Sequence, residues 1–307
     1  MEKIAEFIKE FALLLGELVI LFCIISFIVA ILQIYISKDK IRQILTRKYK
    51  FQNAIFGALL GGITPFCSCS TIPLLLGLLK ANAPFCGVVS YLIASPILNP
   101  AIIFMIFYFF GLKASVIYFL STFLFSVCAG LILDKFGFEK EIKNVILQGE
   151  FSEKTIKNLS GSFWQKQMGI FKLAFILAFD LFKRIFLFLF IGAFIGAIIH
   201  NFVPSDFFDF LSHVNDAFAI CVATIIGIPM YIRAESMLPI GIALMQKGVG
   251  LGIIIALIIG GAGASIPELI LLSSIFKKKM LIAFLICVFF VAVMTGIIFN
   301  LLFEEFL

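Results

Sequence analysis

Long apolar runs, several of them interrupted by proline and glycine, constrain this chain more than any other feature. Four runs are continuous and cover residues 7–36, 114–133, 170–200 and 280–303. Each is about long enough to cross the roughly 30 Å hydrocarbon core of a bilayer as a helix. A soluble domain of 307 residues would not be 62% hydrophobic with only 14% charged residues, because its surface would then be apolar. The chain is therefore predicted to be an all-α polytopic membrane protein.

Four further apolar runs are interrupted, and they cover residues 53–79, 84–112, 217–247 and 249–276. Together with the continuous runs they give about eight hydrophobic segments. Proline disfavours helical geometry and lacks an amide donor, so the backbone at these interruptions is expected to leave the helix. Non-helical backbone at membrane depth survives only when it is buried in protein or lines a cavity. The interruptions therefore indicate where a site lies.

The two halves of the chain show the same order of segments. Each half has a continuous span, two discontinuous segments and another continuous span. When Pro73 is aligned with Pro239, the later breaks of the two halves coincide within one residue. This order predicts two structural repeats. The expected boundaries are residues 1–133 for the first membrane repeat, 134–169 for a hydrophilic linker and 170–307 for the second membrane repeat.

The distribution of positive charge favours one arrangement of these repeats over another. If all four segments of each half crossed fully, the halves would be parallel and Lys and Arg would divide evenly between the two sides. If residues 53–79 and 219–247 instead dip in and return as re-entrant hairpins, the repeats are inverted and the charge is strongly asymmetric. One side then holds residues 38–50, Lys80, 134–168 and 277–279, and the other holds Lys3, Lys9, Lys113 and Lys247. We therefore prefer inverted repeats, whose hairpin tips meet near the midplane.

The first interruption, TPFCSCSTIP at residues 64–73, holds two thiols two positions apart, Cys67 and Cys69. Its two prolines predict that residues 64–72 are unwound. On a helix these two thiols would point in nearly opposite directions, whereas an irregular segment can aim both at one atom. Thiolates select soft centres such as Cu(I), Zn and, by the same softness argument, trivalent arsenic or antimony. Cys67 and Cys69 are therefore candidate substrate ligands, with the hydroxyls of Ser68 and Ser70 beside them.

The remaining cysteines are weaker candidates. An isolated cysteine is more often a packing residue than a reactive one, and this interpretation suits Cys23, Cys128, Cys221 and Cys287. Cys86 is a possible third thiol, because a bare trivalent ion takes three, but it stands at the far end of the predicted hairpin. The cysteines are odd in number and all lie in apolar segments, which indicates reduced thiols and no disulfide framework.

The second half places charges where the first half places thiols. The repeat alignment makes Arg233 the counterpart of Cys67, and Glu235 the counterpart of Cys69. A charge at the bilayer centre costs at least ~2.5 kcal/mol unless it is paired or solvated. Either Arg233 and Glu235 form a structural ion pair, or Glu235 exchanges a proton while Arg233 sets its acidity or balances a bound thiolate.

Two further polar residues stand at the later interruptions. Asn99, before Pro100, either offers its amide to a substrate or ends a helix. Glu268 follows Pro267, and the spacing Ser265-x-x-Glu268 matches a capping box that opens a half-helix. Capping alone would explain Glu268, and a role in coupling is the alternative.

Several function classes are excluded by what the sequence lacks. No phosphate-binding loop, nucleotide-binding glycine pattern or hydrolase motif is present, so we expect neither an enzyme nor a cofactor. The net charge of +6 is spread over loops, so it reports membrane topology and not nucleic-acid binding. The expected partners are a small thiophilic substrate and the lipid bilayer; the sequence does not indicate an oligomeric state.

The thiol motif resembles the signature of the ArsP family of predicted permeases. The later segments SPxxNP at residues 95–100 and RAE at residues 233–235 are similar to that family as well, and the resemblance runs from about residue 50 to 303. It implies a multi-pass permease of the bacterial inner membrane. In the characterised branch of the family it implies export of trivalent organic arsenicals such as methylarsenite. Only Cys67 and Cys69 carry over as candidate arsenic ligands.

The leading hypothesis is thus a secondary-type exporter in which the arsenical exchanges onto Cys67 and Cys69 at the midplane and Glu235 takes up a proton to help release it. Two alternatives stay open. One is a permease for another soft or sulfur-containing solute. The other is a membrane protein that handles metals or undergoes thiol redox chemistry.

Overall fold

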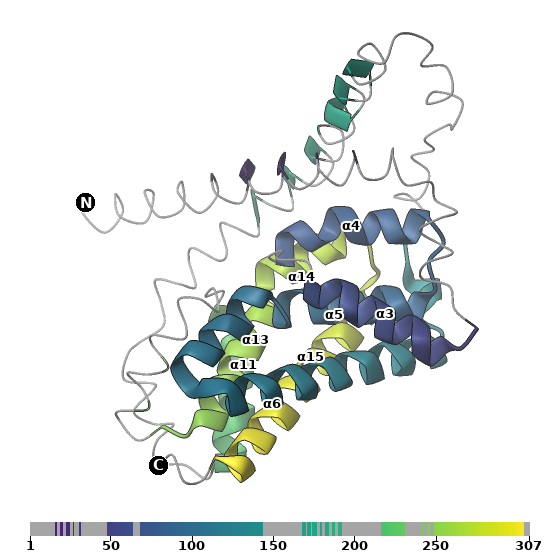
Figure 1. Cartoon of the computed structure of the whole chain (residues 1–307). Helices are drawn as coiled ribbons and strands as arrows, with labels where there is room; N and C mark the ends of the chain where they lie inside the picture. The colour runs from purple at the N-terminus through teal and green to yellow at the C-terminus, as the bar shows by residue number, and fades with distance from the viewer. Residues whose placement is uncertain are drawn as a thin grey trace.

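The computed structural model of the chain is helical through nearly all of the part that it describes (Figure 1). The described residues are 48–63, 68–143, 216–230 and 249–303, with isolated positions within 16–31, 168–191 and 241–245. For residues 68–70 and 230 the backbone alone is described. The helices of the first half are α3 (Lys50–Ile63), α4 (Ser68–Lys80), α5 (Phe85–Ile97), α6 (Pro100–Lys135) and the short 3-10 helix η1 (Phe138–Glu141). Those of the second half are α11 (Asp216–Met230), α13 (Leu251–Gly263), α14 (Ile266–Ser273) and α15 (Lys278–Leu302).

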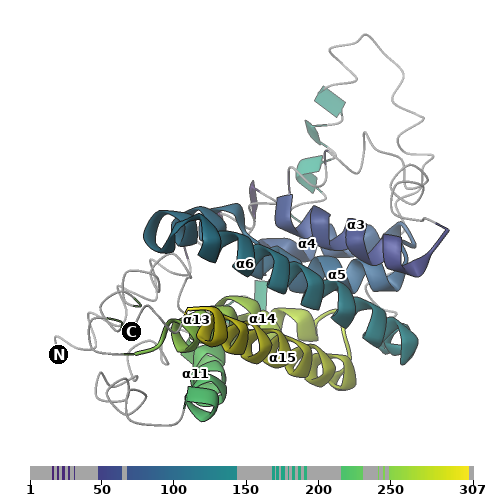
Figure 2. The same ribbon diagram turned by 60° about the horizontal axis from the view of Figure 1, so that its bottom comes forward.

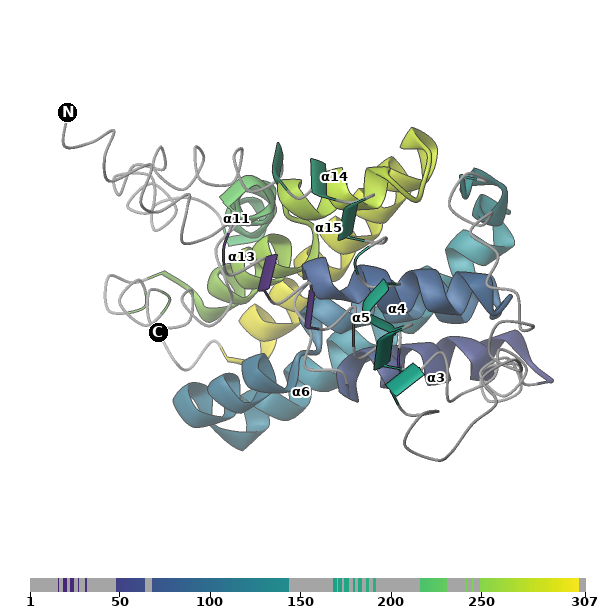
Figure 3. The same ribbon diagram turned by 90° about the horizontal axis from the view of Figure 1, so that it is seen from above.

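The two sets of helices lie side by side as two groups (Figures 2 and 3). Among the described residues, three stretches are long and apolar enough to cross a membrane: Pro100–Lys135, Leu251–Ser273 and Lys278–Leu302. This confirms the prediction of an all-α membrane protein.

The core lies around α5 and α13. Every residue of α5 is buried, and so are nearly all residues of α13. The long helices α6 and α15 instead expose apolar faces. On α15, for example, Ile282, Ile286 and Phe290 follow one another at four-residue intervals and are each more than half exposed. Such faces suit contact with lipid, because lipid tails are as apolar as these side chains.

The helix breaks agree with the proline pattern in two places and differ from it in a third. α5 ends at Ile97 and α6 begins at Pro100, as the interruption at residues 95–100 predicts. A comparable break separates α13 from α14. The prediction that residues 64–72 are unwound is wrong from residue 68 onward, because α4 begins at Ser68 and contains Pro73. Residues 64–67 lie outside the described part.

Pro73 fits inside α4 because it stands close to the start of the helix. The first turn of a helix has N–H groups that need no partner inside it, so a helix can begin shortly before a proline. Pro73 removes only the hydrogen bond that an amide at this position would donate to the carbonyl of Cys69. A second irregularity lies within α6, where Gly111 has φ 82° and ψ 176° and kinks the helix. A positive φ of this kind is readily adopted only by glycine.

In the first half, α3 goes in one direction and α4 returns. α3 and α5 run parallel, because a Cβ added to Gly57 would meet Gly87 and one added to Gly61 would meet Tyr91 and Ser95. α4 runs antiparallel to α5, since Thr71 near its start contacts Ser95 near the end of α5. The start of α3 and the end of α4 therefore lie at the same end of the molecule.

The long helices α6 and α15 lie side by side and antiparallel (Figure 2). At one end the Lys113 ammonium lies 5.1 Å from the ring centroid of Phe303. Near the middle the rings of Phe125 and Phe290 are 5.9 Å apart. Past the other end of α6, Ile142 forms an isolated antiparallel bridge with Phe276, just before α15. The order of these three contacts shows that α6 and α15 run antiparallel.

The shorter helices α5 and α13 enter from opposite ends of this pair. α5 is antiparallel to α6, because Cys86 faces Gly130 while the Tyr118 hydroxyl donates to the carbonyl of Ile97 at 2.9 Å. α13 is antiparallel to α15 in the same way, with Gly252 against Asn300 and Gly263 against Val288. The carboxyl ends of α5 and α13 meet, because a Cβ on Gly263 would lie 3.0 Å from the Ile97 side chain.

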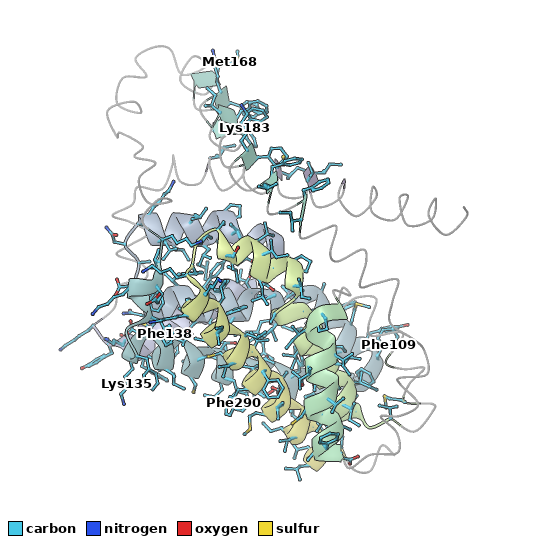
Figure 4. The ribbon with its side chains drawn as sticks, turned by 180° about the vertical axis from the view of Figure 1, so that it is seen from behind. Phe109, Lys135, Phe138, Met168, Lys183 and Phe290 are labelled. Atoms are coloured by element: carbon cyan, nitrogen blue, oxygen red, sulfur yellow. The ribbon has the colours of Figure 1, made fainter. Side chains whose placement is uncertain are left out.

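Lysines gather at one end of the molecule, which we call the basic end. Lys50 pairs with Asp134 at 2.7 Å, and the Lys143 ammonium donates to the carbonyl of Ser273 at 2.6 Å. Lys277 lies 3.9 Å from Glu141. Figure 4 shows Lys135 and Phe138 at this end, Phe109 at the opposite end and Phe290 between them.

Candidate functional site

Five helix ends meet about halfway along the pair formed by α6 and α15. We call this region the helix-end junction (residues 68–71, 95–100 and 263–268). The starts of α4, α6 and α14 meet the ends of α5 and α13 there. Its depth is set by Tyr118 of α6 and Val288 of α15, which contact Ile97 and Gly263. Val288 lies near the middle of α15 (Lys278–Leu302), so the junction is away from either end of the helix pair.

The thiol motif reaches this junction through α4. Because α4 begins at Ser68, the backbones of Ser68, Cys69 and Ser70 form its first turn. One residue further, Thr71 Oγ1 lies 3.1 Å from Ser95 Oγ, and both residues are fully buried. The side chains of residues 68–70 and all of Cys67 lie outside the described part. The placement of the backbone nevertheless ties the motif to the end of α5.

Asn99 serves as the N-cap of α6. Its Oδ1 accepts a hydrogen bond from the backbone N–H of Ala101 at 3.0 Å. This bond satisfies one of the N–H groups at the start of α6 that lack an intrahelical partner. The side-chain oxygen is thus occupied by capping, and the amide NH₂ group is the part of Asn99 that can serve a substrate.

Glu268 and Ser265 do not form the capping box that their spacing suggests. Ser265 occupies the N-cap position of α14, but its side chain makes no capping hydrogen bond. Its Oγ is buried and has no hydrogen-bond partner among the described residues. Capping therefore does not explain why a carboxylate stands here.

Glu268 is also distinguished by its burial. Its side chain is 0% exposed, whereas the other described carboxylates, Asp134, Glu139, Glu141 and Asp216, are all partly or fully exposed. Ionisable residues inside membrane segments are costly and usually functional. Glu268 is therefore the strongest candidate for proton chemistry in the part of the chain that the structure describes.

Cys86 is not brought to the junction. It is the second residue of α5, and its Sγ donates to the carbonyl of Lys50 at 3.5 Å, at the basic end. Ser95 follows Cys86 by nine positions on α5, which corresponds to about 13 Å along the helix axis. Arg233 and Glu235 lie outside the described residues, so their placement is not described.

Three buried hydroxyls lie at the junction, and the sequence argument did not bring them together there. Thr71 and Ser95 contact each other across α4 and α5, and Ser265 adds a third buried hydroxyl at the start of α14. All three stand within four residues of a proline in an apolar run. Small hydroxyl side chains close to prolines inside apolar segments are thus the sequence signal that these three residues share.

Among the described residues, no group of three His, Cys, Asp or Glu side chains is placed to hold a metal ion. Described cysteines are unpaired thiols: Cys23, Cys86, Cys128, Cys221 and Cys287. The helix-end junction instead contains the first turn of α4, which includes Cys69. Next to this turn lie the buried carboxylate of Glu268 and buried hydroxyl groups.

Comparison with known proteins agrees with a membrane transporter. The chain is 34% identical over 89 residues to the UPF0718 protein YcgR of Bacillus subtilis, which covers 29% of this chain and 30% of that protein. It is 30% identical over 80 residues to a Streptococcus mutans protein described as a candidate subunit of a two-component membrane permease complex, covering 26% of each chain. These matches span less than a third of either relative. No solved structure matches the chain.

The family comparison covers far more of the sequence. The family described as ArsP predicted permeases matches residues 3–301, which is nearly the whole chain. Its members are membrane transporters by that description, in agreement with the long apolar helices of the fold. The chain therefore belongs to the ArsP family of predicted permeases.

Proposed function

We propose that this permease exports trivalent organic arsenicals of the methylarsenite type, bound by Cys67 and Cys69 near the middle of the bacterial inner membrane. The observation that carries the proposal is the start of α4 at Ser68, which places the Cys69 backbone at the helix-end junction. Ser68, Ser70 and Asn99 complete the proposed substrate site.

Two thiols match the chemistry of such a substrate. A monosubstituted trivalent arsenical carries one carbon group and two exchangeable hydroxyls, so two cysteines can replace both hydroxyls. Soft thiolates prefer soft centres of this kind over the hard cations that carboxylates bind. Exchange with water reverses the binding, as release on the far side requires.

The proposed carrier consists of two inverted repeats, residues 1–133 and 170–307, joined by a linker at 134–169. Support comes from glycine contacts that recur after 166 positions. A Cβ on Gly61 would meet the carbonyl of Tyr91 and the amide of Ser95, and one on Gly227 would meet Leu257 and Gly261 in the same way. Every residue in the second set follows its counterpart in the first by the same interval.

A second set of contacts has the same interval. A Cβ on Gly130 would meet the Cys86 carbonyl, and one on Gly296 would meet the Gly252 carbonyl. The antiparallel arrangement of α6 and α15 supports inversion of the repeats, since counterparts in parallel repeats would run the same way. Inverted repeats that meet at broken helices are a common basis for alternating access in secondary transporters.

The basic end is proposed to face the cytoplasm. Lysines favour the cytoplasmic side of membrane proteins, and Lys50, Lys135, Lys143 and Lys277 all lie at this end. Arg233 and Glu235 are proposed to balance or protonate the site from the second half.

Everted membrane vesicles test the function directly. Vesicles with the wild-type protein should accumulate methylarsenite. Cys67→Ser and Cys69→Ser should each lower the initial rate on the order of tenfold or more, because loss of a ligand costs at least as much as loss of an outer-sphere partner. Cys128→Ser is the matched control, since this exposed thiol of α6 stands two residues before Gly130, which faces Cys86 near the basic end and away from the junction. Equal accumulation by all four proteins would reject the arsenical as substrate.

A further inference from the structure

Glu268 and Cys69 occupy the first turns of two adjacent helices that run in the same direction. α14 packs against α4 (Figures 1 and 3). α14 starts close to where Gly263 meets Ile97, and α4 starts close to where Thr71 meets Ser95, two residues earlier on α5. Both helices therefore begin at the helix-end junction.

The far ends of α4 and α14 agree with this direction. α14 ends at Ser273, whose carbonyl accepts a hydrogen bond from Lys143 at the basic end. α4 ends at Lys80, one short turn before α5, whose second residue Cys86 contacts Lys50 at the same end. The backbone of Cys69 and the residue Glu268 are thus at similar depths on neighbouring helices.

Among the other described titratable groups on the helices packed against α14, the lysines stand elsewhere, whereas Cys287 is next to Val288, which contacts Gly263 at the junction. α4 carries Cys69 at its start and Lys80 at its end, and α15 carries Lys278 and Lys279 at its start and Cys287 further along. The three lysines lie at the basic end. Of the titratable groups on α4, only Cys69 shares the depth of Glu268. A second polar group at this depth is the buried Oγ of Ser265, which has no hydrogen-bond partner in the described ranges.

Binding of a trivalent arsenical by thiols requires proton movement. Each step forms one As–S bond and breaks one As–O bond, and the proton of the thiol leaves with the hydroxyl as water. For both steps together, R–As(OH)₂ and two Cys–SH groups give R–As(S–Cys)₂ and two water molecules. Arsenic stays trivalent, so no oxidant or reductant takes part. A buried site lacks bulk water to carry these protons, so a positioned carboxylate speeds the exchange.

We infer that Glu268 is the proton relay of the thiol site. It accepts the proton of a cysteine thiol and passes it to the departing arsenic-bound hydroxyl, and it performs the reverse transfer when the substrate is released. Ser265 offers its hydroxyl to an arsenic-bound hydroxyl beside the carboxylate. This inference rests on the proposed function, because it assigns a role within the same site.

The test measures exchange rate and equilibrium binding separately, on the purified full chain in detergent with phenylarsine oxide as the probe. Bound arsenical protects Cys67 and Cys69 from maleimide, so quenching with maleimide at increasing times gives the exchange rate. Glu268→Gln should slow exchange on the order of 10²-fold, the usual contribution of a general acid or base. The amount bound at equilibrium should be unchanged, because a relay alters the rate alone.

Two further variants separate a relay from a structural role. Glu268→Asp retains a carboxylate and should recover part of the rate. Thr295→Val is the matched control, since it removes another buried polar group, on α15 and away from the junction, and should behave as wild type. The wild-type rate should also fall in D₂O, and Glu268→Gln should lose that isotope effect.

The outcomes distinguish this inference from the proposed function. If the wild-type protein does not bind phenylarsine oxide, the proposed arsenical site is rejected. If the wild-type protein binds it and Glu268→Gln exchanges equally fast, the relay is rejected and the thiol site stands. A variant that binds less arsenical at equilibrium but keeps the isotope effect would also overturn the relay, because Glu268 would then only support the fold.

Discussion

Ile97 and Gly263 stand 166 residues apart in the chain and touch each other at the middle of the molecule. A Cβ added to Gly263 would lie 3.0 Å from both Cγ1 and Cδ1 of Ile97. The same interval relates the glycine contacts of the two halves, so each of these two residues is the proposed counterpart of the other. A residue that touches its own counterpart lies next to the axis that relates the two copies. The end of α5 is thus placed at the centre of the proposed repeat.

The close packing of α3 on α5 predicts different outcomes at two adjacent glycines. A Cβ on Gly61 would lie 2.9 Å from the backbone nitrogen of Ser95, which cannot move without shifting α5. A Cβ on Gly62 would come no nearer than 3.5 Å, to the side chain of Leu98. Gly61→Ala should therefore destabilise the protein by about 1–3 kcal/mol. Gly62→Ala should be neutral or slightly stabilising, because alanine favours helix.

Thermal unfolding of both variants in the same detergent measures this difference. A loss of stability in Gly62→Ala as large as that in Gly61→Ala would contradict the close approach of α3 and α5 at Gly61.

The hydrogen bond between Thr71 and Ser95 predicts non-additive effects on stability. Thr71→Val leaves the Ser95 hydroxyl buried without this partner, which should cost about 1–3 kcal/mol. The double variant Thr71→Val/Ser95→Ala removes both hydroxyls and should cost less than the two single changes together. A double-mutant cycle on unfolding midpoints measures the coupling. Strictly additive effects would show that the two hydroxyls do not interact.

The packing of α6 along α15 predicts from which side of the membrane a cysteine at each end of this helix pair reacts with a maleimide. Lys113→Cys lies at the Phe303 end of the helix pair and should react with an impermeant maleimide in intact cells. Lys140→Cys lies at the basic end and should react only in everted vesicles. The measurement is the maleimide labelling of each variant after subtraction of the labelling of the native cysteines in the wild-type protein. Reaction of both cysteines from the same side would show that α6 does not cross the membrane between them.

The ion pair between Lys50 and Asp134 predicts a pH dependence restricted to alkaline solution. The hydrogen bond to Asp134 and its negative charge raise the pKa of the Lys50 ammonium above the ordinary 10.5. A raised pKa of a cation contributes stability that is fully present below the unfolded value and is lost as pH rises through the folded value. The difference in stability between wild type and Lys50→Met should thus be constant below about pH 9 and shrink at higher pH. Because Lys50 is exposed, the difference should be small and should weaken with added salt.

Much of the fold follows from local chemistry that a sequence shows. The breaks before Pro100 and Glu268 are predictable, because proline next to a polar residue in an apolar run leaves few other conformations. The start of α4 was not predictable in this way. Pro73 was expected to unwind the chain before it, but a proline near the start of a helix costs only one internal hydrogen bond.

The burial of Glu268 could not be predicted from its local sequence. Its spacing from Ser265 matches a capping box, and a capping glutamate is ordinarily exposed. Only the packing of α14 against α4 and α15 shows that its carboxylate is enclosed and that Ser265 does not cap. The contact between α14 and α4 joins residues that are about 200 positions apart in the chain, so no local sequence pattern can predict it.

The bridge between Ile142 and Phe276 makes the contacts between the two halves unequal at the two ends of the molecule. To part the halves at the basic end, the protein must break the bonds from the Lys143 amide to Ile275 and from the Lys277 amide to Glu141, each 2.9 Å long. At the opposite end the described contact between these helices is a lysine over an aromatic ring, which yields more readily. For the proposed carrier, whose basic end faces the cytoplasm, we therefore expect opening toward the cytoplasm to cost more free energy than opening toward the outside.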